Sequence, residues 1–120
     1  MCTKHVLEKS CHLSFLILSA GGGCFYDLGS GTGKVVLAAA LLHDFKYCRG
    51  VELLRGLHEV AVGYQDEWQK VRSSPVVEYT LGSILDREVI DWASDGDIVF
   101  SNTHCFDPEM MMALSALAGK

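Results

Sequence analysis

The 120-residue sequence predicts an α/β protein with a doubly wound, mostly parallel sheet flanked by helices. From residue 21 onward, apolar runs of strand length alternate four times with stretches of helical periodicity. A glycine-rich loop joins the first strand to the first helix of this alternation. The composition, 49% hydrophobic and 21% charged with 12 Gly and 2 Pro, excludes disorder, collagen and a disulfide scaffold. We expect a single domain over residues 1–120.

The first half of the alternation contains two strands and two helices. Residues 24–28 form a short apolar run bounded by glycines, which predicts a buried strand. Every second residue of the loop 29–33 is Gly, and the helix predicted over 34–43 is apolar on nearly every face, so we expect it to be packed on several sides. A second strand over 47–53 precedes a long amphipathic helix over 57–71.

The second half repeats the pattern after a break at Ser-Ser-Pro, residues 73–75. Residues 76–81 are rich in β-branched and aromatic side chains and predict the third strand. A short helix over 85–93 and a fourth strand over 97–102 follow. The last helix begins with Asp107 as N-cap and Pro at the first helical position, and it continues to residue 118.

Both ends of the chain depart from a complete fold of this class. Residues 1–22 predict a leading helix and loop before the α/β core at 23–120. Two lysines before the apolar run 13–18 outline a signal peptide, but Glu8 lies in the would-be basic region and the run is short. We therefore expect an intracellular protein, in the nucleus or the cytoplasm. The chain stops after the fourth helix, so we expect the sheet to lack its last strands.

Charge and cysteine content narrow the classes of partner. With 10 basic and 15 acidic side chains the net charge is −5, and no basic patch is visible, so no direct nucleic-acid binding is expected. The five cysteines are odd in number and lack Cys-x-x-Cys spacing, which favours reduced thiols and predicts no metal site. The longest uncharged apolar stretch, 13–26, is too short and too rich in Gly to predict a membrane span.

The glycine loop at 29–33 departs from two common nucleotide-binding motifs. A P-loop ending at Gly-Lys would require Gly in place of Leu28 and a hydroxyl residue in place of Val35. A dinucleotide-binding loop would require Gly in place of Lys34 or Val36. The remaining pattern is Gly-x-Gly-x-Gly after an acid and before a helix, which favours a ligand site over a tight turn alone.

Polar residues follow the predicted strands where their carboxyl ends meet, which is where such sheets bind ligands. Asp27 ends the first strand and Glu52 the second, where a carboxylate can accept both hydroxyls of a ribose. Ser83 and Ile84 follow the third strand and offer a polar group and an apolar face to an adenine, and Asn102 ends the fourth. Three alternatives stay open: Asp27 as a helix cap, Glu52 as a solvated acid, and Asn102 as a turn residue.

Three segments carry a family resemblance: 25–37 with its Asp-Leu-Gly-Ser-Gly loop, 50–54 with Gly-Val-Glu, and 97–102. They resemble the class I S-adenosylmethionine-dependent methyltransferases, which have a Rossmann-like sheet. More narrowly, they resemble the disruptor-of-telomeric-silencing type of histone-lysine methyltransferase, over residues 25–112. The resemblance implies S-adenosyl-L-methionine as cofactor.

The resemblance also implies roles for individual residues. Asp27, Gly29 and Gly31 surround the methionine portion of the cofactor, and Ser30 and Gly33 of the same loop are further cofactor-binding residues. Glu52 then holds the ribose, while Ser83 and Ile84 lie near the adenine. Asn102 matches the first Asn of the family's lysine channel and is the expected catalytic residue. Thr103, His104 and Phe106 line the rest of that channel.

The function expected from these residues is methyl transfer from S-adenosylmethionine to a lysine of a protein, possibly a histone, in chromatin. A non-catalytic cofactor-binding or partner-binding remnant of the same fold is the first alternative. A small-molecule methyltransferase and a nicotinamide-dependent enzyme are the others. An exposed sheet edge would also allow a homodimer.

Overall fold

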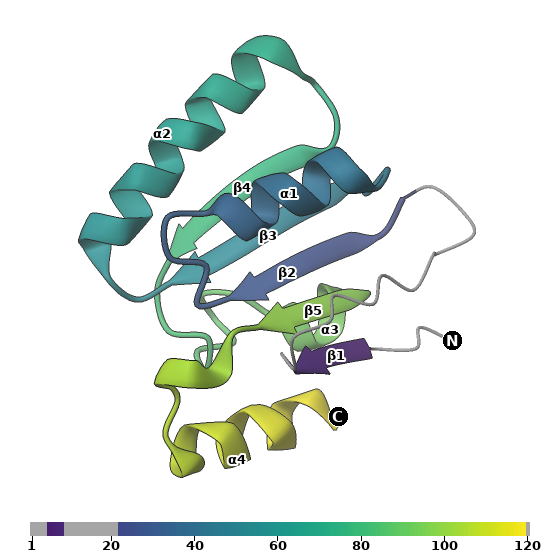
Figure 1. The fold of residues 1–120 in the computed structure, drawn as a ribbon. Helices are drawn as coiled ribbons and strands as arrows, with labels where there is room; N and C mark the ends of the chain where they lie inside the picture. The colour runs from purple at the N-terminus through teal and green to yellow at the C-terminus, as the bar shows by residue number, and fades with distance from the viewer. Residues whose placement is uncertain (1–4, 9–21, 120) are drawn as a thin grey trace.

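The computed structural model describes residues 5–8 and 22–119, with only the backbone described for 5–8. Its sheet has five parallel strands in the order β1-β5-β2-β3-β4 (Figure 1). The strands are β1 (His5–Glu8), β2 (Cys24–Leu28), β3 (Tyr47–Glu52), β4 (Val76–Leu81) and β5 (Ile98–Ser101). The helices are α1 (Lys34–Leu42), α2 (Arg55–Val71), α3 (Trp92–Asp95), the 3₁₀ helix η1 (Thr103–Cys105) and α4 (Pro108–Ala118).

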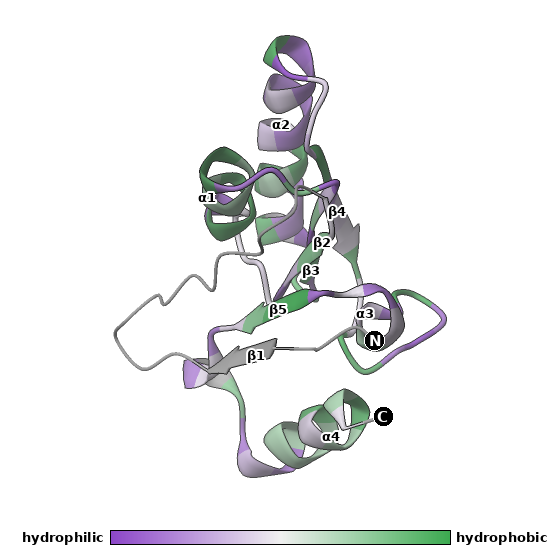
Figure 2. Cartoon of the chain, turned by 90° about the vertical axis from the view of Figure 1, so that its right-hand side faces the viewer, coloured by the Kyte–Doolittle hydropathy of each residue, from purple (hydrophilic) through white to green (hydrophobic). Residues whose placement is uncertain are grey.

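The chain winds in two directions from β2, which makes the sheet doubly wound. From β2 it runs through α1 and α2 to β3 and β4 at one edge. It then returns through α3 to β5, on the other side of β2. Consequently α1 and α3 lie on opposite faces of the sheet (Figure 2). The topological switch point falls between β2 and β5, and crevices that bind ligands form at such points.

Alternate residues of the strands pack on opposite faces of the sheet and belong to two separate hydrophobic cores. Phe25 packs toward α1 and α2, whereas Tyr26 packs toward α3 and α4. The first core adds buried side chains from both helices and from β3, β4 and β5, including Val36, Ala61, Trp68, Cys48, Tyr79 and Phe100. The second includes Leu28, Val51, Ile84, Trp92, Val99 and Leu114. All five residues of β2 are therefore buried, because helices cover both faces of the sheet.

The predicted alternation is confirmed for most elements, with boundaries that differ by one or two residues. Helix α4 begins as predicted, because Asp107 Oδ1 accepts from the Met110 N–H at 2.8 Å and Pro108 occupies the first turn. Helix α1 is less enclosed than its composition predicts. It buries Val36 and two alanines against the sheet and leaves Leu41 and Leu42 exposed.

Residues 1–22 were expected to form a leading helix and loop, and this is wrong for residues 5–8. That segment is β1, paired in parallel with β5 so that His5 opposes Ile98 and Glu8 opposes Ser101. A short apolar run fits a helix or a strand equally well from its pattern alone. The edge of β5 determines that this run forms a strand, because it offers backbone hydrogen-bond partners. The sequence pattern of the run carries no information about that edge. The rest of the predicted helix lies outside the described residues.

The helix predicted over 85–93 is also wrong. This segment forms successive turns, and α3 begins only at Trp92. Polar side chains bond here to the backbone N–H two residues further on: Ser83 Oγ accepts from Leu85 and Asp86 Oδ1 accepts from Glu88. Short polar side chains stabilise turns in this way at the expense of helices.

Within the part of the chain that the structure describes, no helix is long and apolar enough to cross a membrane.

Candidate functional site

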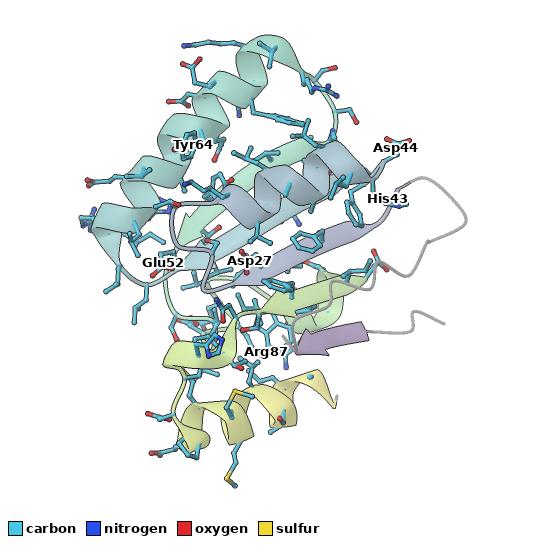
Figure 3. The ribbon with its side chains drawn as sticks, in the orientation of Figure 1. Asp27, His43, Asp44, Glu52, Tyr64 and Arg87 are labelled. Atoms are coloured by element: carbon cyan, nitrogen blue, oxygen red, sulfur yellow. The ribbon has the colours of Figure 1, made fainter. Side chains whose placement is uncertain are left out.

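The carboxyl ends of four strands meet at one edge of the sheet. In the strand register Leu28 of β2 lies opposite Val51 of β3 and Ser101 of β5, and Val51 lies opposite Thr80 of β4. The loops that follow these strands therefore converge, as the sequence predicts. Figure 3 shows Asp27 and Glu52 at this end of neighbouring strands.

The glycine loop turns sharply over the end of β3. Gly29, Gly31 and Gly33 have φ values of 79°, 55° and 88°, a region that favours glycine. The N–H groups of Gly29 and Ser30 both donate to the Val51 carbonyl, at 2.8 and 2.9 Å. No atom of the described residues lies within 4 Å of the position that a Cβ on Gly31 would take.

Glu52 fastens the loop to the adjacent strand. Its Oε2 accepts from the Gly31 N–H at 2.7 Å and its Oε1 accepts from the Leu54 N–H at 3.0 Å, and the residue is only 8% exposed. A carboxylate has about four lone-pair sites, so each oxygen keeps acceptor capacity for a ligand hydroxyl. Glu52 is therefore a held, largely desolvated acid and not the solvated one considered as an alternative.

Asp27 is a buried carboxyl group without a hydrogen-bond partner at Oδ1 among the described residues. The residue is 2% exposed, and burial together with the negative charge of Glu52 raises its pKa to about 7. It does not cap α1, because the N-cap is Gly33 and no side chain of residues 22–119 bonds to that helix end. A cation at Oδ1 would supply the missing partner and favour the ionised form.

Two further features make the loop receptive to a polar ligand. The hydroxyl of Ser30 is buried and also lacks a partner among the residues that the structure describes. The first turn of α1 has neither a side-chain cap nor an acidic residue. Free N–H groups and the positive end of a helix dipole attract an anionic group. The loop thus places an anion-binding helix end close to the buried carboxyl of Asp27.

Ser83 and Ile84 lie after β4, as predicted, and they play different structural parts. Ser83 is half-buried at the edge, and its Oγ accepts from the Leu85 N–H at 3.2 Å. The Ile84 side chain is 5% exposed within the second core, and its carbonyl accepts from the indole N–H of Trp92 at 2.7 Å. Ile84 therefore packs in the core beneath this edge of the sheet and leaves little of its side chain exposed to a ligand.

The segment predicted to line a substrate channel folds back against the glycine loop. Asn102 is exposed and precedes η1, and it makes no side-chain cap bond to that helix. Thr103 is half-buried and His104 is exposed. The Phe106 ring lies beside Gly29, since a Cβ on Gly29 would be 3.5 Å from its Cζ atom. The structure thus brings Phe106 to the loop and leaves Asn102 and His104 at the surface.

Tyr79 contacts the loop although no sequence motif includes it. Its hydroxyl donates to the Gly33 carbonyl at 2.6 Å from the interior of the sheet. The sequence shows only a tyrosine in a strand expected to be buried. Any core tyrosine whose hydroxyl has a hydrogen-bond partner would look the same. No group of three or more His, Cys, Asp or Glu side chains among the described residues is arranged to hold a metal ion.

The architecture is similar to that of solved structures. One, assigned as an S-adenosyl-L-methionine-dependent methyltransferase from Methanococcus maripaludis, matches 85% of this chain with a TM-score of 0.63 and 18% identity. The YcgJ protein from Bacillus subtilis matches 55% of this chain with a TM-score of 0.45 and 24% identity. This chain spans 44% and 26% of those two chains, respectively.

The sequence itself matches a protein family. The family described as "Histone methylation protein DOT1" matches residues 18–119, which is more than half of the 120 residues. This match confirms the resemblance given by the motifs, and with it S-adenosyl-L-methionine as the cofactor. The doubly wound sheet is the fold expected of such a protein. The chain belongs to the DOT1 histone methylation family of class I S-adenosylmethionine-dependent methyltransferases.

Proposed function

We propose that this chain holds the cofactor of a protein-lysine methyltransferase, with a histone as the protein substrate. The observation that carries the proposal is the buried, unpartnered Oδ1 of Asp27 beside an uncapped helix end. Together they suit a ligand that carries an ammonium group and a carboxylate on the same carbon atom, as the amino-acid part of S-adenosylmethionine does. The DOT1 match supports the histone substrate, which would place the protein in the nucleus.

The residues present fit three parts of the cofactor: its amino-acid end, its ribose and the edge of its adenine. Asp27 suits the α-ammonium group, and the N–H groups at the start of α1 suit the carboxylate. Glu52 retains lone pairs for the ribose hydroxyls while it holds Gly31. Ser83, at the end of β4, offers a hydroxyl to the adenine edge.

The chemistry asks little of the protein beyond placement. S-adenosylmethionine supplies a methyl group on a positively charged sulfur, so the protein need not provide a nucleophile. In the transfer, a bond forms from the amine nitrogen to the methyl carbon as the carbon–sulfur bond breaks, and its electron pair stays on sulfur. The nitrogen then loses a proton to solvent. The chain must therefore hold a neutral amine in line with the methyl group.

The position of the segment after β5 supports this role. Phe106 packs beside Gly29 and covers the loop with an apolar ring, which lowers the water content next to the reacting atoms. A water-poor environment lowers the pKa of a lysine amine and so favours its neutral form. Asn102, exposed directly after β5, would orient the incoming amine with its side-chain carbonyl oxygen. His104, two residues further on, is also exposed, and we assign it no proton transfer.

A methyl-transfer assay with matched acceptors tests this proposal. The full chain is incubated with methyl-labelled S-adenosylmethionine and either native histones or histones whose lysines have been chemically acetylated, which turns each amine into an amide that cannot accept a methyl group. We expect label in the native histones and at least a tenfold loss in the blocked ones, with Asn102→Ala about tenfold slower on native histones. Label that persists in blocked histones contradicts a lysine acceptor. Cofactor binding without transfer to any protein or small amine supports the non-catalytic alternative.

An exposed sheet edge also supports the proposal of a homodimer. β4 is the outermost strand at one side of the described sheet. The Tyr79 N–H of that strand is already bonded to Gln65, so only part of the edge is free. Light scattering over a range of concentrations distinguishes a dimer from a monomer.

A further inference from the structure

Tyr79 joins the interior of β4 to the glycine loop across the sheet. Its hydroxyl donates to the carbonyl of Gly33 at 2.6 Å, and the two residues are 46 positions apart in the sequence. The side chain is buried, and burial together with the nearby carboxyl of Asp27 raises the pKa of Tyr79. The phenol therefore stays protonated and remains a hydrogen-bond donor.

Two glycines make room for the Tyr79 ring. A Cβ atom on Gly33 would lie 2.5 Å from the Cζ atom of Tyr79. A Cβ atom on Gly50 would lie 2.9 Å from its Cδ1 atom and 2.6 Å from the Cβ atom of Ser30. Side chains at either position would collide with the ring, so Gly50 in the Gly-Val-Glu motif is required by packing beneath the loop.

The backbone of Tyr79 is held as firmly as its hydroxyl. Among the strands that the structure describes, β4 is the outermost at its edge of the sheet, so alternate N–H groups of β4 have no partner in another described strand. Gln65 of α2 supplies the acceptor, with its Oε1 atom 3.1 Å from the Tyr79 nitrogen. Tyr79 is thus held both at its backbone N–H and at its side-chain hydroxyl.

The bond to Gly33 also fixes an N–H group. Because the peptide unit is planar and trans, the carbonyl of Gly33 and the N–H of Lys34 point in opposite directions. With the carbonyl held by Tyr79, and shared with the Leu37 N–H at 3.3 Å, the Lys34 N–H is directed out of the N-terminal end of α1. That helix end has no side-chain cap to hold it in place.

We propose that Tyr79 is a positioning residue for cofactor binding, which acts through Gly33 without touching the ligand. It holds the Gly33–Lys34 peptide so that the N–H groups at the start of α1 face the carboxylate of S-adenosylmethionine before the cofactor arrives. This inference rests on the proposed function, in which that helix end binds the amino-acid part of the cofactor. Preorganised donors bind more tightly because their ordering is not part of the cost of binding.

The test compares Tyr79→Phe with Tyr64→Phe in the full chain. Both variants lose one hydroxyl, but Tyr64 lies on the partly exposed face of α2 (Figure 3). We expect Tyr79→Phe to bind S-adenosylmethionine about tenfold more weakly by titration calorimetry, which corresponds to about 1.4 kcal/mol, and Tyr64→Phe to match the unmodified chain. In transfer assays the KM for S-adenosylmethionine should rise by that factor, while the KM for the protein acceptor stays the same.

A second variant keeps the test valid if Tyr79→Phe fails to fold. Gln65→Ala keeps the bond from Tyr79 to Gly33 but frees the backbone of Tyr79, and we expect about threefold weaker binding. Equal cofactor affinity in Tyr79→Phe, Gln65→Ala and Tyr64→Phe overturns the positioning role, even if unfolding occurs at lower denaturant concentration. If the unmodified chain binds the cofactor and Asp27→Asn does not, the equal affinity of those three variants overturns the inference alone and leaves the proposed function in place. A chain that binds no cofactor overturns both it and the proposed function.

Discussion

Asp27 is the most unusual titrating residue of the site. It carries a carboxyl group at the end of a buried strand, 2% exposed, with Oδ1 unpartnered among the described residues. Burial is the larger cause of its raised pKa, and the negative charge of Glu52 is the smaller. An acid in this state is stabilised by a bound cation and by protonation alike, so its titration reports on the ligand site.

The pH dependence of stability follows from this residue. Its pKa is about 7 in the folded chain against a usual value of 3.8, so the folded state holds the proton more tightly. Without ligand, the contribution of Asp27 to stability is greatest below pH 3.8 and is lost as the pH rises to about 7. Denaturant unfolding at pH 5 and pH 8 should show that Asp27→Asn gains stability relative to the unmodified chain at pH 8. A difference between the two chains that is the same at both pH values contradicts a raised pKa.

At this scale the sequence predicts some residues and misses others. Asp27, Glu52 and the loop glycines were predicted because they follow one another in short motifs at strand ends, where parallel strands converge. Tyr79 was missed because its role depends on a bond to a residue 46 positions away. Ile84 was predicted at the adenine and lies in the core, because the turns after β4 direct its side chain inward.

The glycine loop, β3 and β4 form a single packed unit at the scale of elements. The loop rests on Val51 through two N–H bonds, Glu52 holds Gly31, and Tyr79 holds Gly33. Gly50 lies where these contacts cross, with no space for a side chain. The conformation of the loop is therefore set by the two neighbouring strands as well as by its own glycines.

Replacing Gly50 by Ala tests this packing, with Gly63→Ala as a matched control. The added methyl at 50 would meet Ser30 at 2.6 Å and Tyr79 at 2.9 Å, so we expect destabilisation of about 1–3 kcal/mol and weaker cofactor binding. Gly63 lies within α2 with nothing within 4 Å, so its replacement should stabilise the chain by up to about 1 kcal/mol. Urea unfolding measures both. If Gly50→Ala is as stable as the unmodified chain, the loop is not packed as described.

Elements with strong local signals were predicted and those set by context were not. Helix α4 was found from its N-cap Asp107 and the following Pro, and α2 from its apolar periodicity. The turns over 85–91 defeated the helix prediction, since Ser83 and Asp86 bond to nearby N–H groups. β1 could not be found from the sequence because its partner, β5, lies more than 90 residues later.

For the whole molecule, the order of strands and helices was enough to predict a doubly wound sheet, and the structure and the family match confirm it. The order of elements does not predict that β1 pairs with β5 at the edge of the sheet. The chain spans 44% of the methyltransferase from Methanococcus maripaludis that it matches. Its described part contains the switch point and all four strand ends of the proposed cofactor site.

Titration calorimetry with S-adenosylmethionine tests the central claim most directly. The unmodified chain should bind one equivalent, and at pH 7 the measured heat should vary with the ionisation enthalpy of the buffer, because a bound ammonium group displaces the proton of Asp27. Asp27→Asn should bind at least about tenfold more weakly and lose the dependence on buffer. No heat with the unmodified chain, or equal affinity in Asp27→Asn, would contradict a cofactor site built on this carboxyl group.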